Sequence, residues 1–237
     1  MHAHCLIVCN SKKEEKTMFY DNTLLFMING LSGHSVWVDK VIMILSEYGP
    51  VVFSLYLISL WFSGNSTDEL TENRKRALYA FFAAMLAMGM NQLISHIWYR
   101  NRPYLDQPVN RLLQGAQDAS FPSDHAAGAF SIAGSLFGRT AGSNLLMAFA
   151  ILVALSRVYV GLHYPSDILG GMTTGLVSSW LIERNKGLLD KPLTLLLATW
   201  TIIETKLHLP VPSLARTGQG GECSCDLCRS CYDCLVV

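Results

Sequence analysis

The chain has 237 residues, which is enough for one domain, or for one domain with a small appendage. Hydrophobic residues make up 51% of the sequence and charged residues only 15%, and the mean hydropathy is +0.29. Because a soluble domain usually carries about 25% charged residues, this composition excludes an ordinary soluble protein. Basic and acidic residues number 18 each, and the zero net charge argues against a nucleic-acid partner. The composition therefore predicts an integral membrane protein.

Long apolar runs follow one another along the chain, with the charged residues confined to the joins between them. This pattern predicts membrane-spanning helices. The runs cover residues 41–62, 78–99, 126–142, 144–160 and 168–182, and a shorter run at 193–203 is a candidate for a partial or interfacial sixth span. Residues 24–38 mix apolar and polar side chains and are predicted to lie at the membrane interface. The expected fold is all-α, a polytopic membrane helical bundle of five or six spans over residues 18–205.

The two ends of the chain differ from this domain in composition. Residues 1–17 are an uncertain N-terminal extension, in which a charged run follows an apolar one, the reverse of the order in a signal peptide. Residues 206–237 form a cysteine-rich tail with the spacing C-x-C-x2-C-x2-C-x2-C. That spacing is compatible with a zinc site, but the tail has no packed flanks to fix a tetrahedral geometry. We expect a disordered extension without a metal.

Ionisable residues gather in three clusters at the ends of the apolar runs, where charge is costly to place beside lipid. The clusters are residues 100–103, residues 121–125, and residues 156–157 together with 163–167. If the spans alternate in direction, all three fall on one side of the membrane. The sequence thus predicts one pocket that contains two or more arginines, two histidines, a serine and an aspartate.

Such a set of side chains suits phosphate chemistry. Arginine binds phosphoryl oxygens through two parallel hydrogen bonds and stays charged at any working pH. Ser123 precedes a predicted helix, where a hydroxyl and free backbone N–H groups attract an anion. One histidine can attack phosphorus while another protonates the leaving oxygen. Because no cluster of carboxylates is present to bind Mg²⁺, we expect neither a metal nor another cofactor.

Three sequence signatures resemble those of the type 2 phosphatidic acid phosphatase superfamily, and the resemblance covers roughly residues 18–189. The third signature, S-R-x5-H-x3-D, is matched by Ser156, Arg157, His163 and Asp167. The second, P-S-G-H, is matched by residues 122–125 with Asp124 in place of glycine. The first, K-x6-R-P, ends at Arg102 and Pro103, but Ser95 stands where the family has lysine.

The resemblance implies a role for each matched residue. His163 would be the nucleophile of a phosphohistidine mechanism, with Asp167 as its orienting partner and His125 as the acid and later the base. The phosphoryl oxygens would be held by Arg102, Arg157 and Ser123. Because the family lysine is absent, one phosphate contact is either missing or supplied by Arg100 or Arg111. Asp124 would repel a phosphate, so we expect it in the first helical turn, where the helix dipole favours an anion.

The Asp-containing second signature and the missing lysine are similar to the bacterial undecaprenyl-diphosphatases of the bacitracin-resistance type. That resemblance implies hydrolysis of a polyprenyl diphosphate, which recycles the carrier lipid of cell-wall synthesis. Glu47 and Asn91, polar residues within apolar runs, are further candidates to line the site.

Other functions fit parts of the sequence. One is a lipid phosphatase of other or broad specificity, acting on phosphatidylglycerophosphate or phosphatidate, and another is a non-catalytic transport or resistance protein. A vanadate-dependent haloperoxidase would share the anion pocket but is soluble. Each site residue alone also has a structural explanation, as a headgroup anchor for the arginines or as a helix cap for Ser123 and Asp167. Their coincidence on one side favours catalysis.

Basic residues in the joins predict the orientation in a bacterial inner membrane. When the presumed phosphate ligands Arg102 and Arg157 are left out, the side of the membrane that holds the three clusters has three basic residues, Lys40, Arg100 and Arg111. The other side has seven, Arg74, Lys75, Arg76, Arg139, Arg184, Lys186 and Lys191. Since positive residues in short loops mark the cytoplasm, the active site is expected on the extracytoplasmic side. If residues 24–38 do not cross the membrane, the side of the clusters also holds Lys12, Lys13 and Lys16. The counts of basic residues are then six on that side and seven on the other.

Overall fold

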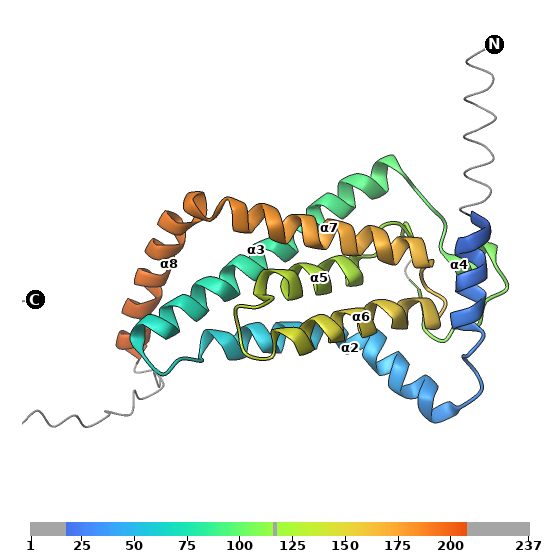
Figure 1. Cartoon of the computed structure of the whole chain (residues 1–237), viewed down its shortest axis with the longest axis horizontal. Helices are drawn as coiled ribbons and strands as arrows, with labels where there is room; N and C mark the ends of the chain where they lie inside the picture. Colours follow the sequence, from blue (N-terminus) through green and yellow to red (C-terminus); the bar gives the residue numbers. More distant parts are fainter. Residues whose placement is uncertain (1–17, 116–117, 208–237) are drawn as a thin grey trace, which may run out of the picture.

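The computed structural model describes residues 18–115 and 118–207, and all regular secondary structure in these ranges is helical. The helices are residues 18–29, α2 (Val36–Trp61), α3 (Thr67–Ile97), α4 (Pro103–Asp106), α5 (Asp124–Leu136), α6 (Ser143–Tyr159), α7 (Pro165–Arg184) and α8 (Lys186–Leu207). Five of them, α2, α3, α5, α6 and α7, lie side by side along the long axis of the molecule (Figure 1). The predicted all-α fold is confirmed.

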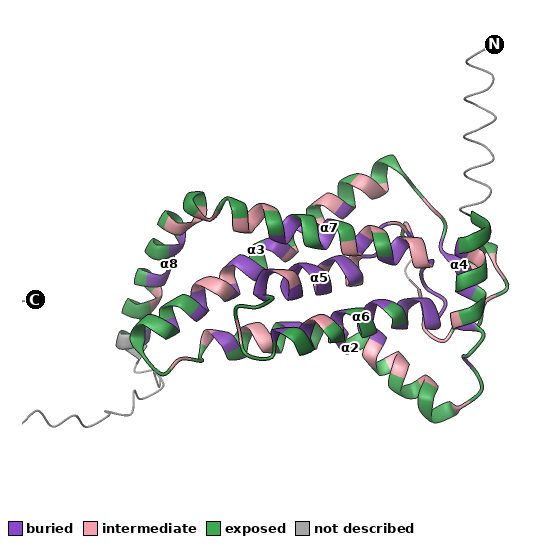
Figure 2. Cartoon of the chain, in the orientation of Figure 1, coloured by how far each residue is buried: buried purple, intermediate pink, exposed green. Residues whose placement is uncertain are grey.

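Helix α5 is the centre of the bundle and packs against α3, α6 and α7. Its residues are mostly small, and nearly the whole helix is buried (Figure 2). Two glycines of α7 allow the closest approach. A Cβ atom on Gly171 would lie 2.3 Å from the carbonyl oxygen of Ser123, and one on Gly175 would lie 2.5 Å from that of Ala127. Because α5 and α7 touch along their backbones, their N-termini meet at one end of the bundle.

The outer face of the bundle is apolar, as expected for contact with lipid. Large hydrophobic side chains of α2 are exposed along its length, among them Val41, Ile44, Leu55 and Ile58. In the described part of the chain, α2 and α3 are long and apolar enough to cross a membrane. Helix α6 is apolar but has 17 residues, and α5 has only 13. The expectation of five or six spans therefore stays a prediction.

Residues 24–38 do not form the single interfacial segment that their composition predicts. The chain is helical over 18–29, turns at 30–33, and enters α2 at Val36, five residues before the predicted start of the first run. Gly33 has a φ of +84°, a conformation that favours glycine and that breaks the helix here. The helix 18–29 lies across one end of the bundle (Figure 1), where Asn29 donates to the carbonyl oxygens of Asn110 at 2.9 Å and Tyr159 at 2.8 Å.

Helix α8 crosses the opposite end of the bundle (Figure 1) and is longer than the predicted run at 193–203. A buried ion pair ties it to α3, with Arg74 Nη2 2.5 Å from Glu204 Oε1. A charged pair of this kind satisfies both side chains inside an apolar bundle. The predicted extension at 1–17 lies outside the described residues, and so does the cysteine-rich tail apart from residues 206–207, which complete α8.

Candidate active site

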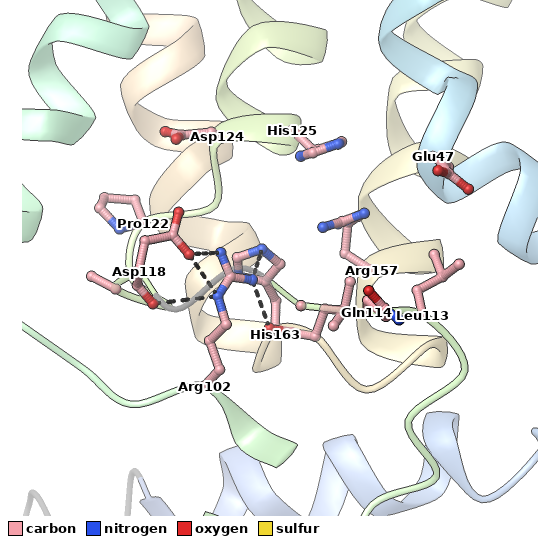
Figure 3. A pocket seen from close by; sticks show the side chains of 13 residues that line it. Glu47, Arg102, Leu113, Gln114, Asp118, Pro122, Asp124, His125, Arg157 and His163 are labelled. Atoms are coloured by element: carbon pink, nitrogen blue, oxygen red, sulfur yellow. Dashed lines mark hydrogen bonds and ion pairs between the residues drawn. The ribbon is translucent and has the colours of Figure 1, made fainter. Parts of the chain in front are cut away.

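A cavity of about 520 Å³ opens at the end of the bundle where α3, α5, α6 and α7 present the three sequence clusters (Figure 3). Its lining combines two histidines and two arginines with three carboxylates. The residues are Glu47, Arg102, Leu113, Gln114, Gly115, Asp118, Ala119, Pro122, Asp124, His125, Arg157, Leu162 and His163. Residues that lie far apart in the sequence thus converge in one pocket, but Ser123 and Asp167, which were also expected there, are not among the lining residues.

The two ring nitrogens of His163 have partners of opposite kinds. Nδ1 lies 2.9 Å from the carbonyl oxygen of Ser120, which can only accept a hydrogen bond. Nε2 lies 3.2 Å from Nη1 of Arg102, which can only donate. The proton therefore sits on Nδ1, and Nε2 carries a lone pair. A neutral imidazole in this tautomer presents its unprotonated nitrogen on the side of Arg102.

Burial lowers the pKa of the His163 imidazole below its ordinary value. The positive charges of Arg102 and Arg157 act in the same direction, whereas the neighbouring Asp167 carboxylate opposes them. A buried imidazole beside two guanidinium groups is poorly stabilised as a cation. His163 is consequently neutral at physiological pH, the form that can attack phosphorus.

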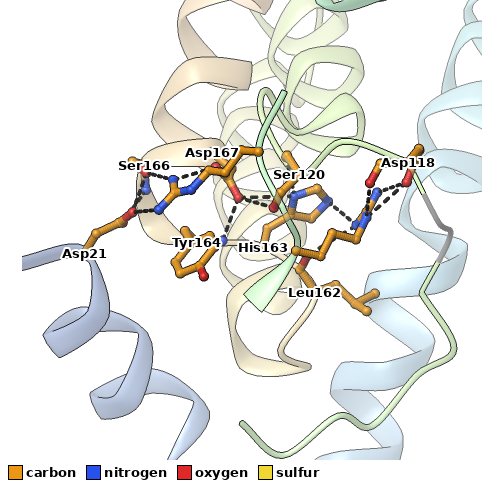
Figure 4. A network of polar contacts seen from close by, with 10 residues as sticks. Asp21, Asp118, Ser120, Leu162, His163, Tyr164, Ser166 and Asp167 are labelled. Atoms are coloured by element: carbon orange, nitrogen blue, oxygen red, sulfur yellow. Dashed lines mark hydrogen bonds and ion pairs between the residues drawn. The ribbon is translucent and has the colours of Figure 1, made fainter. Parts of the chain in front are cut away.

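Asp167 lies behind His163 and not in the cavity. Its Oδ2 is 3.7 Å from Nδ1 of His163, and it accepts hydrogen bonds from the Ser120 hydroxyl at 2.5 Å and the Tyr164 backbone N–H at 2.8 Å. Ser120 thus connects the two side chains, because its hydroxyl binds the carboxylate while its carbonyl binds the imidazole (Figure 4). Sequence reasoning missed Ser120, which lies in an irregular loop and outside all three signatures.

Arg102 projects from the start of α4 into the cavity. Its Nε and Nη2 donate to the carboxylate of Asp118 at 3.0 and 2.6 Å, and its Nη1 also donates to the carbonyl of Leu162 at 3.2 Å. The Asp118 side chain is 60% exposed, so it occupies the fork of the guanidinium from the open side. Asp118 was also missed, since nothing in the spacing of an acidic loop residue indicates this contact.

Two buried polar atoms near the cavity have no hydrogen-bond partner among the described residues. One is Nε of Arg157, whose Nη1 donates to the backbone oxygen and hydroxyl of Ser46 at 3.2 and 2.9 Å. The other is the hydroxyl of Ser123, directly before α5. Buried polar groups are normally paired, so each of these atoms could still donate a hydrogen bond to a bound group such as an oxyanion.

His125 occupies the first turn of α5 and faces two cavities. Besides the polar cavity, it lines an apolar one of about 290 Å³ together with Asp124 and residues from α2, α3, α5 and α6, including Pro50, Phe53, Met88 and Val153. The two cavities therefore meet at the start of α5. A polar cavity thus lies beside an apolar one.

The further candidates have different positions. Glu47 and Asp124 line the cavity, whereas Asn91 is buried on α3, where it donates to Asp124 at 2.8 Å and accepts from the Thr174 hydroxyl. Arg100 is not among the lining residues, because its guanidinium binds Asp21, Ser166 and Asp167.

Arg111, the other residue considered as a replacement for the family lysine, does not line the cavity either. Ser95 donates to the carbonyl of Gln92 within α3. Arg111 stacks over the ring of Tyr104 at 4.2 Å and donates to the carbonyl of Leu113. Neither lines the cavity, while Gln114 does.

Comparison with known proteins agrees with this geometry. Residues 76–187, which contain all three signatures, match the PAP2 superfamily. The chain is also 34% identical over 181 residues to an undecaprenyl-diphosphatase of Bacillus subtilis (strain 168), covering 76% of this chain and 91% of the relative. The chain belongs to the PAP2 superfamily.

Two further similarities extend the comparison. A bacitracin transport permease protein of Bacillus licheniformis is 31% identical, over 65% of this chain and 75% of that protein. Among solved structures, a transmembrane PAP2-type phosphatidylglycerolphosphate phosphatase from Bacillus subtilis has a TM-score of 0.54 at 20% identity, covering 78% of this chain and 92% of that one. The fold is that of a PAP2 membrane protein.

Proposed function

We propose that this PAP2 protein hydrolyses undecaprenyl diphosphate to undecaprenyl phosphate and inorganic phosphate through a phosphohistidine intermediate. The observation that carries the proposal is the tautomer of His163, whose unprotonated Nε2 lies beside Arg102 at the cavity. The undecaprenyl-diphosphatase relative that matches over most of both chains supports the choice of substrate.

In the first half of the reaction, Nε2 of His163 attacks the terminal phosphorus of the diphosphate. The P–N bond forms as the bond between phosphorus and the bridging oxygen breaks, and His125 gives its proton to that oxygen as the lipid phosphate leaves. Arg102, Arg157 and the Ser123 hydroxyl hold the phosphoryl oxygens, which bear the charge of the transition state. Arg102 exchanges its contacts with Asp118 and Nε2 for these oxygens.

In the second half, water releases the phosphate. His125, now unprotonated, takes a proton from a water molecule whose oxygen attacks phosphorus, and the P–N bond breaks. His163 returns to its starting tautomer because the Ser120 carbonyl still accepts the Nδ1 proton. In this mechanism Arg102, Arg157 and Ser123 supply the charge stabilisation. We therefore expect activity to persist in EDTA.

The apolar cavity beside His125 suits the first isoprene units of the lipid. It shares Asp124 and His125 with the polar cavity, so a lipid whose diphosphate lies in the polar cavity can place the start of its chain in the apolar one. The rest of a long prenyl chain extends into the bilayer along the exposed apolar face of the bundle.

We place the active site on the extracytoplasmic face of the bacterial inner membrane. Arg76 donates to the carbonyl of Arg139, which pairs with Glu183 at 3.0 Å. The basic joins at the start of α3 and the end of α7 therefore share the end of the bundle opposite the cavity. Their excess of positive charge supports a cytoplasmic location for that end.

Phosphate release by purified protein tests the proposal and its rivals. The three substrates are undecaprenyl diphosphate, phosphatidylglycerophosphate and phosphatidate, each in detergent micelles and with EDTA present. Preferred hydrolysis of the diphosphate supports the proposal. Preferred hydrolysis of a glycerolipid would make the protein another lipid phosphatase, and no release from any of them would favour a transport or resistance protein.

A further inference from the structure

A cluster of polar side chains connects the helix 18–29 to the back of the active site (Figure 4). Arg100 is its centre. Its Nη2 donates to Oδ2 of Asp21 at 2.7 Å, and its Nη1 donates to Oδ1 of Asp167 at 3.0 Å and to the Ser166 hydroxyl at 2.6 Å. Asp21 in turn accepts from the backbone N–H and the hydroxyl of Ser166 at 2.9 and 2.6 Å.

These contacts leave Asp167 immobile. Its side chain is fully buried, and a buried carboxylate is tolerated only when it is paired. Oδ2 is held by Ser120 and Tyr164, so the cation that balances the charge is Arg100 at Oδ1. The guanidinium also lies over the ring of Tyr164 at 3.7 Å from its centroid, which restricts it to one plane.

Arg100 in turn depends on Asp21. A guanidinium between two carboxylates can place one terminal nitrogen on each, which a lysine ammonium cannot do in the same geometry. The Asp21 side chain is 6% exposed and belongs to a helix that lies outside the residues matched to the PAP2 superfamily, 76–187. The helix 18–29 therefore contributes directly to the charge balance behind His163.

We propose that Asp21 and Arg100 are positioning residues for the reaction. Asp21 orients Arg100, Arg100 fixes Asp167 and thereby Ser120, and Ser120 keeps the proton of His163 on Nδ1. This inference rests on the proposed phosphatase function. It assigns Arg100 a task different from binding phosphate, and it makes the segment that precedes α2 a part of the catalytic centre.

The test is a double-mutant cycle of Asp21→Asn, Arg100→Gln and the double variant, with kcat and KM measured on the preferred substrate. We expect Asp21→Asn to lower kcat about tenfold and Arg100→Gln about hundredfold, with KM within about twofold, by analogy with residues that orient a ligand. If Asp21 acts through Arg100, the double variant is no slower than Arg100→Gln alone. Arg100→Lys is expected to restore only part of the loss.

Glu183→Gln is the matched control, because it also converts an ion-paired carboxylate to an amide but lies at the opposite end of α7. Its kcat is expected to equal that of the wild type. Asn29 anchors the helix 18–29 independently through Asn110 and Tyr159, so Asp21→Asn should keep the fold. Equal melting temperatures in detergent check this point.

A second measurement does not depend on the substrate. The ¹⁵N NMR shifts of the His163 ring report which nitrogen carries the proton. We expect Nδ1–H alone in the wild type and in Glu183→Gln, and a mixture of tautomers in Arg100→Gln. If the wild type hydrolyses none of the three lipids, the proposed function fails while this measurement still decides the positioning role. Three outcomes would overturn the positioning role. They are an unchanged His163 tautomer in Arg100→Gln, losses of kcat that multiply in the double variant, and a raised KM at unchanged kcat.

Discussion

Nη1 of Arg102 lies 3.2 Å from Nε2 of His163, so the arginine proposed to bind phosphate and the proposed nucleophile are already in contact. Because a guanidinium only donates, this contact selects the tautomer whose lone pair faces the substrate. Nothing about the two residues in sequence, where they are 61 positions apart, requires this pairing.

His163→Ala should abolish turnover. No neighbouring side chain can replace the nitrogen that attacks phosphorus, and loss of a nucleophile typically lowers kcat by about 10⁴-fold or more. Brief incubation of the wild type with ³²P-labelled diphosphate, followed by denaturation, should trap a label that is labile in acid and stable in alkali. A variant that retains near-normal kcat, or a label with the opposite stability, would exclude the phosphohistidine.

His125→Ala should slow the reaction according to the leaving group. General acid catalysis typically contributes 10²–10⁴-fold, and it matters most where the leaving oxygen is a strong base. A lipid phosphate leaves readily, whereas the alkoxide of phosphatidate does not. We therefore expect a larger loss of kcat on phosphatidate than on undecaprenyl diphosphate. Equal losses on both substrates would assign His125 to binding instead.

The dependence of kcat/KM on pH should reflect the buried imidazole, because this ratio reports the pKa values of the free enzyme. Burial lowers the pKa of His163, so the neutral nucleophile is retained below the ordinary histidine pKa of about 6.5 and is lost only as the pH falls through the lowered value. The acidic limb of the profile should consequently lie below pH 6.5. A limb at or above the ordinary pKa, matched by an NMR titration of the same ring, would contradict the assignment.

The side of the membrane can be tested with cysteine reporters, because all seven cysteines lie outside residues 18–207 and can be replaced without changing any residue of the described bundle. Asn110 is exposed at the site end and Asn65 is exposed at the opposite end, whereas Asn73 is buried and would label poorly. In intact cells, an impermeant maleimide should modify Asn110→Cys and not Asn65→Cys. The reverse pattern would place the active site in the cytoplasm.

The fold class and several of the candidate site residues can be predicted from the sequence itself. The scarcity of charge and the apolar runs predict a helical membrane bundle, since a helix satisfies its own backbone hydrogen bonds in lipid. The signatures point to His125, His163 and Asp167 as candidate site residues because the proposed phosphoryl transfer requires particular residue types at spacings that a helix start fixes. These features are local, so they are visible along the chain.

The tertiary structure decides which polar residues serve the cavity and which support it. Arg100 and Arg102 are two residues apart, yet one faces Asp167 and Asp21 while the other faces His163. Ser120 and Asp118 lie in an irregular loop, where no periodicity reports the direction of a side chain. Asp21 joins them only because the helix 18–29 folds across the end of the bundle (Figure 1). Such contacts depend on how distant segments pack, and spacing along the chain carries no record of them.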